Sequence, residues 1–468
     1  MAIDSRHRAT ALLVAACFFM EILDGTIVST AAPQMGGALR VAPTAIGLVI
    51  TAYLVTLAVL IPLSGWLTAR FGARRVFLTA IALFTLASLA CALTRDLGQL
   101  VAMRIAQGAA GAMMVPVGRL VVLSNTAKPD IPRVMSYVVW PGLLAPVVAP
   151  LLGGLITTYA DWRWMFLVNV PLGVVAYAVA WRLIDAGAGS RPPRLDWLGV
   201  ALVGGSLGSL TYAAHLVSES GPTPTVVVFL VVTVVAGGVA GWHLLRTPAP
   251  LVNLRTLRVA TFRTSVTGGS LFWITCGALP FLLPLLFQDV FGWSPVKSGA
   301  VVLFVFVGNL AIKPATTFLL NRLGFRRLLT GSAIALAATV VACAWFTADT
   351  PLVVIAAVAL LSGVARSVGL TGYSTIAFSD TPPDDLRDAN ALSATAQQTA
   401  AGLGVAVAAV ALQLGHLVAG PAAYAVAFVV LAAIALLAGV TAVRLHPTAG
   451  DAVRRPAAVG GQVAETQP

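Results

Sequence analysis

Charged residues are scarce in this chain of 468 residues: 10% are Asp, Glu, Lys or Arg, and 59% are hydrophobic. A soluble domain carries about 25% charged residues. A soluble protein this apolar would have no way to cover its surface. The composition therefore excludes an ordinary soluble protein and indicates a chain that crosses a membrane many times.

The residues that usually carry catalysis or metal binding are also sparse. Cys17, Cys91, Cys276 and Cys343 stand singly, without metal-ligand spacing, so we expect no disulfide and no metal site. No Gly-Lys dipeptide occurs, which excludes an ATP-binding P-loop. The stretch "GGSLG" (204–208) fits an esterase pattern, but it lies in an apolar segment and lacks the required strand and turn. We therefore expect neither an enzyme nor a cofactor other than a coupling proton. The alternative from another class is a membrane-embedded enzyme or a sensor.

Apolar segments long enough to span a bilayer, about 20 residues each, recur along the whole chain. Their number predicts fourteen transmembrane helices. They lie at 11–32, 46–68, 75–94, 98–123, 133–158, 164–184, 195–217, 223–245, 263–288, 297–320, 327–347, 351–373, 391–415 and 421–443.

The net charge of +12 comes from Lys and Arg residues that follow this topology. With a cytoplasmic N-terminus, only Arg40, Arg95, Arg163 and Lys297 fall in outer loops, and most of the others fall in inner loops or tails. This positive-inside bias predicts that both termini are cytoplasmic. It explains the charge by contact with anionic lipids and leaves no role for nucleic acid.

An internal repeat divides the chain. The stretch "ARFGARRVF" (69–77) and the stretch "NRLGFRRLL" (321–329) share Arg, Gly, Arg and Arg at the same places. Each follows the second helix of a six-helix half, which indicates a duplicated chain of a known transporter plan. We expect an N-terminal six-helix bundle (1–190), two inserted helices (191–246), a C-terminal six-helix bundle (247–445) and a disordered cytoplasmic tail (446–468).

Two carboxylates stand out in "FFMEILDGTIVSTAAP" (18–33), which holds Glu21 and Asp24. A carboxylate at mid-membrane depth costs about 2.5–3.5 kcal/mol or more. Positions i and i+3 share one helix face, and two close carboxylates in a low dielectric do not both ionise easily. Such a pair can load a proton on one side and release it on the other. The alternative is a neutral, hydrogen-bonded structural pair clamped by Arg104 or Arg119.

Four cations lie inside the predicted spans, against only these two acids. Arg104 is always protonated and needs a buried partner such as a carboxylate or Gln107. Arg366 at mid-depth and Lys313 slightly further inward are candidates to bind an anionic group of a substrate. The alternative is that they form internal salt bridges. Arg119, near the inner end of its helix, could instead snorkel.

The predicted substrate site combines these cations with polar and aromatic side chains. Trp140, Trp273 and Tyr373 are the aromatic candidates for a cavity wall. The residues predicted to bind substrate are Arg366, Lys313, Arg119, Gln107, Trp273 and Tyr373.

Five motifs occur in a fixed order along the chain. They are "LDGTIVSTAAP" (23–33), "GWLTARFGARR" (65–75), "RIAQGAAGA" (104–112), "APLLGG" (149–154) and "DWRWMFLVNVPLG" (161–173). In this order they resemble the first-helix, loop 2–3, fourth-helix, fifth-helix and loop 5–helix 6 motifs of one family. That family is the fourteen-helix drug:proton antiporter branch of the major facilitator superfamily. The resemblance covers nearly the whole chain.

The resemblance implies an all-α integral membrane fold with two six-helix bundles and two inserted helices. It implies roles in proton coupling for Asp24, which lies in the matching motif, and for Arg104, whereas Glu21 is extra to that motif. It implies a gate in the loop 2–3 motif and a kinked, closely packed fifth helix. The gate residues are Gly65, Arg70, Gly72, Arg74 and Arg75, and those of the fifth helix are Pro146, Pro150, Gly153 and Gly154.

Two positions depart from the family pattern. Ala69 stands where the loop 2–3 motif usually has an acid that helps to latch the gate, so gating could differ here. Ala149 stands where the fifth-helix motif usually has Gly.

Together, these observations predict a proton-coupled antiporter that exports a drug or metabolite bearing an anionic group. The alternatives are efflux of lipophilic cations, or an uncoupled or importing carrier of the same fold. We expect a monomer in the cell membrane whose partners are its small-molecule substrate, protons and membrane lipids.

Overall fold

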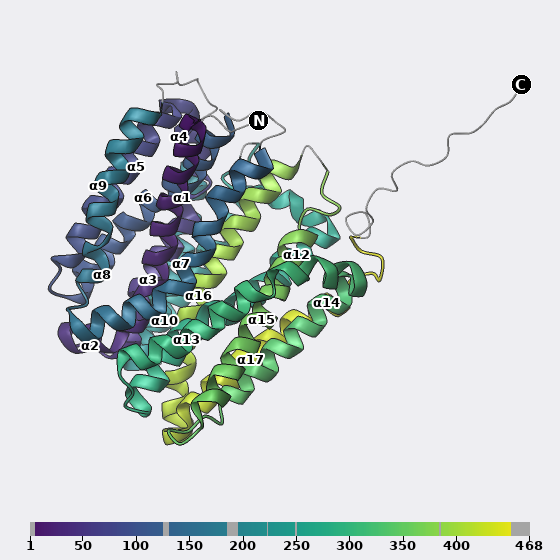
Figure 1. Cartoon of the computed structure of the whole chain (residues 1–468). Coiled ribbons are helices and arrows are strands. Elements are labelled where there is room, and N and C mark those ends of the chain that lie inside the picture. Colours follow the sequence, from purple (N-terminus) through teal and green to yellow (C-terminus); the bar gives the residue numbers. More distant parts are fainter. Residues whose placement is uncertain are drawn as a thin grey trace, which may run out of the picture.

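The computed structural model describes residues 5–124, 131–184, 195–221, 223–248, 250–382 and 385–450. Within these residues the chain is helical and contains no strand, which confirms the predicted all-α fold. Figure 1 shows the helices in two groups, with the first part of the chain on one side and the last part on the other. Most of the predicted tail, from residue 451 onward, lies outside the described residues.

The helices of the first group follow one another with short connections. They are α1 (Ser5–Ile27), α2 (Ala32–Leu39), α3 (Gly47–Leu60), α4 (Leu63–Phe71), α5 (Ala73–Ala92), α6 (Leu97–Ser124), α7 (Ile131–Tyr159), α8 (Trp164–Leu167) and α9 (Asn169–Leu183). The 3₁₀ turns η1 (Val28–Ala31) and η2 (Pro43–Ile46) flank α2. Pro62 separates α3 from α4, because proline lacks the N–H that would continue the helix.

The remaining helices include the inserted pair and the second group. They are α10 (Trp197–Ser220), α11 (Pro224–Arg246), α12 (Ala260–Leu285), α13 (Pro295–Ala311), α14 (Lys313–Cys343), α15 (Leu352–Ile376), α16 (Leu386–Ala419) and α17 (Ala423–Val443). The short elements are η4 (Leu254–Arg258), η5 (Leu286–Val290) and η7 (Gly420–Ala422).

Twelve helices among the described residues are long and apolar enough to cross a membrane. Two shorter apolar stretches, Leu144–Tyr159 and Pro295–Ala311, fall below that length. The chain is therefore a multi-span membrane protein, and the count of fourteen stays a prediction.

The repeated loop motif has the same backbone conformation in both halves. Gly72, between α4 and α5, has φ 83° and ψ 145°, and Gly324, inside α14, has φ 77° and ψ 161°. Residues with a Cβ rarely adopt such φ values. The conformation of Gly72 therefore recurs at its repeat partner Gly324, where α14 is two helical segments joined by a kink.

The two groups of helices meet along α7 and α13 and along α3 and α16. A Cβ added to Gly154 would lie 2.5 Å from the carbonyl oxygen of Pro295, and one added to Gly299 would lie 2.1 Å from that of Pro150. The Gln288 side chain also donates a hydrogen bond of 3.0 Å to the Thr30 carbonyl. The groups are therefore packed backbone to backbone where α7 ends and α13 begins.

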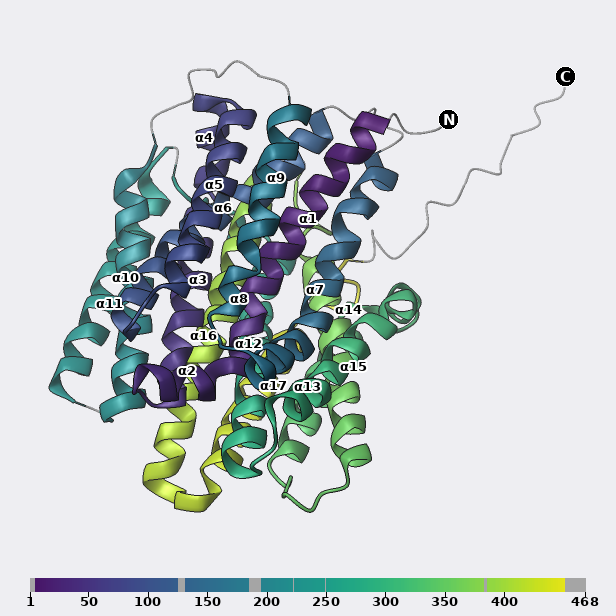
Figure 2. The ribbon, with the colours of Figure 1, turned by 60° about the vertical axis from the view of Figure 1, so that its left-hand side comes forward.

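The inserted helices α10 and α11 pack against each other on the flank of the molecule (Figure 2). Helix α10 also contacts α3 of the first group and α16 of the second. Only 11% of the apolar window of each inserted helix is buried, so most of the pair faces the surroundings. The predicted division of the chain at residues 190 and 246 stays a prediction.

Candidate functional site

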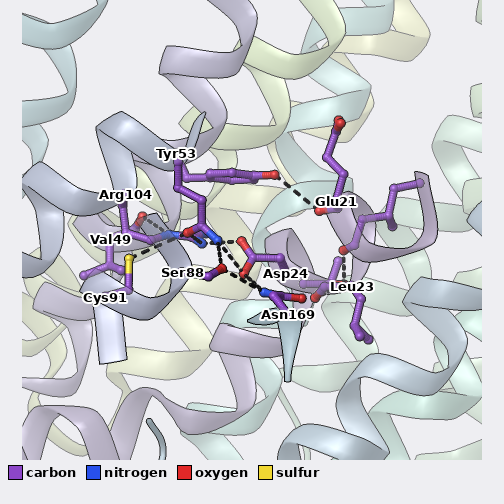
Figure 3. Close-up of polar contacts among 12 residues, drawn as sticks. Glu21, Leu23, Asp24, Val49, Tyr53, Ser88, Cys91, Arg104 and Asn169 are labelled. Carbon is purple, nitrogen blue, oxygen red and sulfur yellow. Dashed lines mark hydrogen bonds and ion pairs between the residues drawn. The ribbon is translucent and has the colours of Figure 1, made fainter. Parts of the chain in front are cut away.

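Asp24 is held in a closed polar cluster inside the first group of helices. Its side chain on α1 is 1% exposed, and Arg104 on α6 is fully buried. The Arg104 Nη1 forms an ion pair with the Asp24 Oδ2 (Figure 3). The same nitrogen donates to the Gln107 Oε1 at 2.8 Å. The sequence-based expectation that Arg104 needs a carboxylate or Gln107 is confirmed, because it contacts both.

The second carboxylate oxygen of Asp24 accepts two further hydrogen bonds. Gln107 Nε2 donates to it at 3.0 Å, and Asn169 Nδ2, at the start of α9, donates at 2.7 Å. Both amides also donate to the Ser88 hydroxyl on α5, at 2.6 and 3.2 Å. Four helices thus hold the Asp24 cluster, which we define as Asp24, Ser88, Arg104, Gln107 and Asn169. Within the described residues the Arg104 Nη2 and the Asn169 Oδ1 have no hydrogen-bond partner. Removing one partner of a buried ion pair destabilises a protein strongly, because the other charge is left buried without compensation.

Tyr53 on α3 lies against this cluster and also lines a cavity. Its ring centroid is 4.1 Å from the Arg104 guanidinium carbon, and the Phe166 centroid is 5.6 Å from the same atom. These are cation–π distances. The Tyr53 hydroxyl donates to the Glu21 carbonyl at 3.3 Å. Tyr53 therefore connects the closed cluster to the cavity wall.

The cavity lies between the two groups of helices and has a volume of about 230 Å³. We call it the central cavity. Its wall comes from α1, α3 and α7 of the first group and from α12, α13, α15 and α16 of the second. Its apolar lining includes Ile22, Ile50, Leu54, Leu57, Pro146, Phe281, Phe306 and Val405.

Glu21 and Arg366 are the charged residues that line the central cavity, and they come from opposite groups of helices. Glu21 is 8% exposed, and its Oε2 has no hydrogen-bond partner among the described residues. The Arg366 Nη1 donates to the Cys276 carbonyl at 3.2 Å, and its guanidinium carbon is 5.2 Å from the Phe306 ring centroid. The Arg366 Nε has no partner. Buried polar atoms without partners are rare in proteins and call for an explanation.

The sequence predicts that the two carboxylates of α1 form a close pair on one helix face. In the structure their side chains point in different directions. Figure 3 shows the Asp24 side chain turned toward Arg104 and Asn169, whereas the Glu21 side chain points away from them. Residues at i and i+3 differ by about 60° around a helix with 3.6 residues per turn, and that difference separates the cluster from the cavity. The charge of Asp24 is balanced by Arg104 and not by sharing a proton with Glu21.

The residues predicted to bind substrate are not all brought together. Arg366 and Trp273 line the central cavity, but Gln107 belongs to the Asp24 cluster. Lys313 donates to the Thr371 hydroxyl at 3.1 Å and does not line the cavity. The expected joint site of Arg366 and Lys313 is therefore not formed in this conformation.

Two further candidates lie away from the cavity. The Arg119 guanidinium carbon is 5.0 Å from the Phe18 ring centroid, and its Nε has no hydrogen-bond partner. The Tyr373 side chain is packed in the second group, where its hydroxyl donates to the Ala438 carbonyl at 3.0 Å. Tyr373 therefore belongs to the packed core of that group and not to the cavity wall. Trp140 lies where the structure describes no side chain.

The loop 2–3 motif is attached to its own half. The Arg74 Nη2 donates to the Trp181 carbonyl at 2.7 Å, and the guanidinium carbon lies 5.3 Å from the Trp181 ring centroid. Arg70, Arg75 and Gly65 are exposed. The role of this motif as a gate stays a prediction.

The fifth-helix motif on α7 makes close contacts on two sides. A Cβ on Gly153 would lie 2.1 Å from the Thr30 hydroxyl and 3.0 Å from the Ile27 carbonyl oxygen of the first helix. Gly154 and Pro150 meet the start of α13, and Pro146 lines the central cavity. The close packing predicted for this helix is confirmed.

The structure also shows residues that the sequence-based analysis did not single out. Asn169 lies within the stretch "DWRWMFLVNVPLG" and is a polar residue in an apolar helix, so a signal was present. Ser88 and Gln398 gave no comparable signal. Gln398 on α16 lines the central cavity, and Tyr53 lines it from α3.

Comparisons with known proteins agree with this arrangement. The family model described as Major Facilitator Superfamily matches residues 14–405. The putative multidrug resistance protein MdtD of Cronobacter sakazakii is 36% identical over 417 residues, 86% of either chain. The protein of the same name from Pectobacterium carotovorum subsp. carotovorum is 35% identical over 412 residues, 87% of this chain and 88% of its own.

Solved structures show the same fold at low identity. The crystal structure of the POT family transporter PepTSo has a TM-score of 0.70 and 15% identity, and covers 94% of this chain and 97% of its own. The D-xylose-proton symporter has a TM-score of 0.67 and 14% identity, with coverages of 94% and 98%.

Proposed function

We propose that this chain, which belongs to the Major Facilitator Superfamily, is a proton-coupled antiporter that exports small organic molecules bearing an anionic group. The superfamily membership and the likeness to proteins named for multidrug resistance support a transporter. The coupling ion and the charge of the substrate are the parts that we propose.

One observation carries the proposal: Glu21 and Arg366 line one cavity from opposite groups of helices, and each has a polar atom with no partner in the described part of the chain. Ionisable residues inside a membrane protein are costly and mark substrate or ion pathways. In this scheme the Arg366 guanidinium binds the anionic group of the substrate, and the Tyr53 and Trp273 rings contact its apolar part.

Glu21 is the proposed proton carrier. A carboxylate whose hydrogen bonds are all made, as at Asp24, gains little from protonation, because the ion pair with Arg104 would be lost. In the part of the chain that the structure describes, Glu21 forms no ion pair, so taking up a proton removes the cost of a buried charge. Antiport then requires that the substrate and the proton on Glu21 occupy the shared cavity in turn, so that the two cross the membrane in opposite directions.

Alternating access uses the packed end of the molecule. The contacts of Gly154 with Pro295 and of Gly299 with Pro150 hold the two groups together at one end. With both termini in the cytoplasm, as the Lys and Arg distribution predicts, this end is the outer one, and the substrate enters from the cytoplasm. Opening requires these backbone contacts to separate.

Efflux of lipophilic cations is the second candidate. A deprotonated Glu21 beside the Tyr53 and Trp273 rings would suit a cation, since carboxylates and aromatic faces both attract positive charge. Arg366 in the same cavity repels a cation, and this is why we favour an anionic group. An uncoupled carrier or an importer of the same fold would use the same cavity.

The test is a flux measurement in liposomes that contain only this protein and a trapped pH dye. A pH gradient is imposed, and organic anions, zwitterionic metabolites and lipophilic cations are added one at a time. Proton movement that follows addition of an anion supports the proposal. Proton movement with lipophilic cations alone selects the second candidate. Substrate flux without proton movement selects the uncoupled carrier.

A further inference from the structure

Figure 2 shows the inserted helix α10 on the flank of the molecule. A second hollow lies between α10 and helices α3 and α6. Its volume is about 690 Å³, and we call it the flank groove. The central cavity and its proposed chemistry do not involve this groove. It is open beside a helix of whose apolar window only 11% is buried, so membrane lipid has direct access to it.

One half of the flank groove is apolar and lined by small residues. Gly204, Gly205 and Gly208 of α10 face it, and a Cβ added to Gly205 or Gly208 would meet nothing within 4 Å. Along α10 the lining extends from Val200 to His215, about 22 Å at 1.5 Å per residue. That length exceeds half of the ~30 Å hydrocarbon core of a bilayer. The groove therefore has the shape to take an acyl chain parallel to the helices.

The other half of the groove is polar and lies toward the C-terminal end of α10. Thr211, His215 and Glu219 are spaced four residues apart and so share one face of the helix. The Thr211 residue is 5% exposed and the His215 side chain 8% exposed, and both residues line the groove. Among the residues that the structure describes, the Thr211 Oγ1 and the His215 Nδ1 find no hydrogen-bond partner. Such orphaned atoms cost free energy, which a ligand that supplies partners recovers.

The charge at this end selects the kind of head group. The Glu219 carboxylate lies 3.5 Å from the His215 Nε2. The Tyr212 ring, whose centroid is 5.9 Å from that of His215, also lines the groove. A carboxylate and an aromatic face both attract a cation with N–H donors. The polar end therefore suits an ammonium and is unfavourable for a purely anionic group.

We propose that the flank groove is a binding site for one membrane phospholipid with a primary ammonium head group, of the phosphatidylethanolamine type. The acyl chain lies along Gly204, Gly205 and Gly208. The ammonium lies at the end of α10 that carries Tyr212, His215 and Glu219, where it donates hydrogen bonds to the polar face. Choline lacks N–H donors and cannot make these bonds.

The test is lipid retention by the purified full-length protein, measured by native mass spectrometry. Phosphatidylethanolamine, phosphatidylcholine and phosphatidylglycerol with identical acyl chains are supplied separately. We expect phosphatidylethanolamine to be retained about tenfold more tightly than phosphatidylcholine, which is the effect of one charge-assisted hydrogen bond. Equal retention of these two lipids would overturn the proposal. Phosphatidylglycerol retained as tightly as phosphatidylethanolamine would overturn the assignment of the ammonium.

Three variants separate the two parts of the site. Gly208→Leu places a larger side chain in the groove at a position where a Cβ meets nothing within 4 Å, and it should lose retention of the lipid. Gly241→Leu on α11 is the matched control, because a Cβ there also meets nothing within 4 Å and Gly241 does not line the groove. Glu219→Gln should retain the acyl chain but lose most of the preference over phosphatidylcholine. Retention by Gly208→Leu equal to that of the Gly241→Leu control would contradict the site.

Discussion

Asp24 and Glu21 lie within one turn of α1 but occupy two different regions. Asp24 is inside the first group of helices, where every described partner is a hydrogen-bond donor and Arg104 balances its charge. Glu21 faces the cavity between the two groups, and its Oε2 has no partner. The comparison shows that two acids three residues apart on one helix can have different surroundings: Asp24 is paired inside the first group of helices, and Glu21, which we propose as the proton carrier, faces the cavity.

A similar contrast separates the two arginines. Arg104 has its charge paired inside one group of helices. Arg366 on α15 lines the cavity, where its contacts within the described residues are the Cys276 carbonyl and the Phe306 ring, and no carboxylate. The interface between the groups therefore holds one incompletely paired group of each sign. In the proposed scheme, a proton can bind to Glu21 and a substrate to Arg366 without breaking the ion pair that is buried inside the first group of helices.

Removing the cation of the Asp24 cluster should have the largest effect on stability. Arg104→Gln leaves a buried carboxylate without its counter-charge, which costs about 3–5 kcal/mol. We expect a large drop in the thermal unfolding temperature of the purified protein. Glu21→Gln removes no ion pair and is the control that should change this temperature far less. An equal drop in unfolding temperature in the two variants would contradict the different surroundings that we assign to Asp24 and Glu21.

Arg366→Gln should act on substrate affinity and not on folding. Hydrogen bonds to charged groups contribute about 1.5–3 kcal/mol, so we expect KM for an anionic substrate to rise about tenfold or more. Lys313→Gln is the matched control, because Lys313 contacts Thr371 and does not line the cavity. An unchanged KM in Arg366→Gln would remove the arginine from the substrate site.

Gly299→Ala tests the packed end of the interface. The added Cβ would lie 2.1 Å from the Pro150 carbonyl oxygen, and overpacking of this kind costs about 1–3 kcal/mol. Because the strain is present only while the groups are packed at this end, the population should shift toward the conformation that is open there. Distances between spin labels on α7 and α13 measure this shift. Gly205→Ala, which meets nothing within 4 Å, should leave the distances unchanged.

Removing the Asp196 carboxyl should have the smallest effect on stability. Like Asp24, this carboxylate accepts several hydrogen bonds, but it has no arginine partner among the described residues. Burial opposes ionisation of this carboxyl, but hydrogen bonds from His243, Gly199 and Leu251 hold its pKa below the ordinary value. Because the folded pKa is depressed, the stabilisation is fully present above the unfolded pKa of about 3.9. It is lost as the pH falls through the lower folded pKa.

The corresponding variant is Asp196→Ala, which also removes the N-cap of α10. The loss of such a cap costs about 1 kcal/mol near neutral pH. Thermal unfolding at pH 7 and at pH 3 measures the contribution, and the difference between variant and parent should be smaller at pH 3. A difference that grows on acidification would have the wrong sign for a carboxyl with a depressed pKa.

Much of the fold could be predicted from the sequence because the bilayer imposes strict periodic constraints. The length of the apolar segments predicted the helices. The repeat of "ARFGARRVF" in "NRLGFRRLL" predicted a duplicated chain, and it places Gly72 and Gly324 at equivalent positions, where both have a positive φ. The Arg104 partner could also be predicted, because a buried guanidinium must find an acceptor.

The composition of the cavity could not be predicted in the same way. Spacing along α1 placed Glu21 and Asp24 on one face, but the packing of α5, α6 and α9 around Asp24 separates them. Tyr373 and Arg366 lie two turns apart on α15, and only contacts with α17 and α12 reveal which one faces the cavity. These outcomes depend on neighbours far apart in the sequence.

The most direct test of the account compares proton movement in Glu21→Gln and Asp24→Asn. Both variants are reconstituted with a trapped pH dye, and the substrate that drives proton movement in the parent is added. We expect Glu21→Gln to remain folded and to lose substrate-driven proton movement, because its cavity carboxyl can no longer titrate. Substrate-driven proton movement that persists in Glu21→Gln and is lost only in a well-folded Asp24→Asn would contradict the assignment of the proton to Glu21.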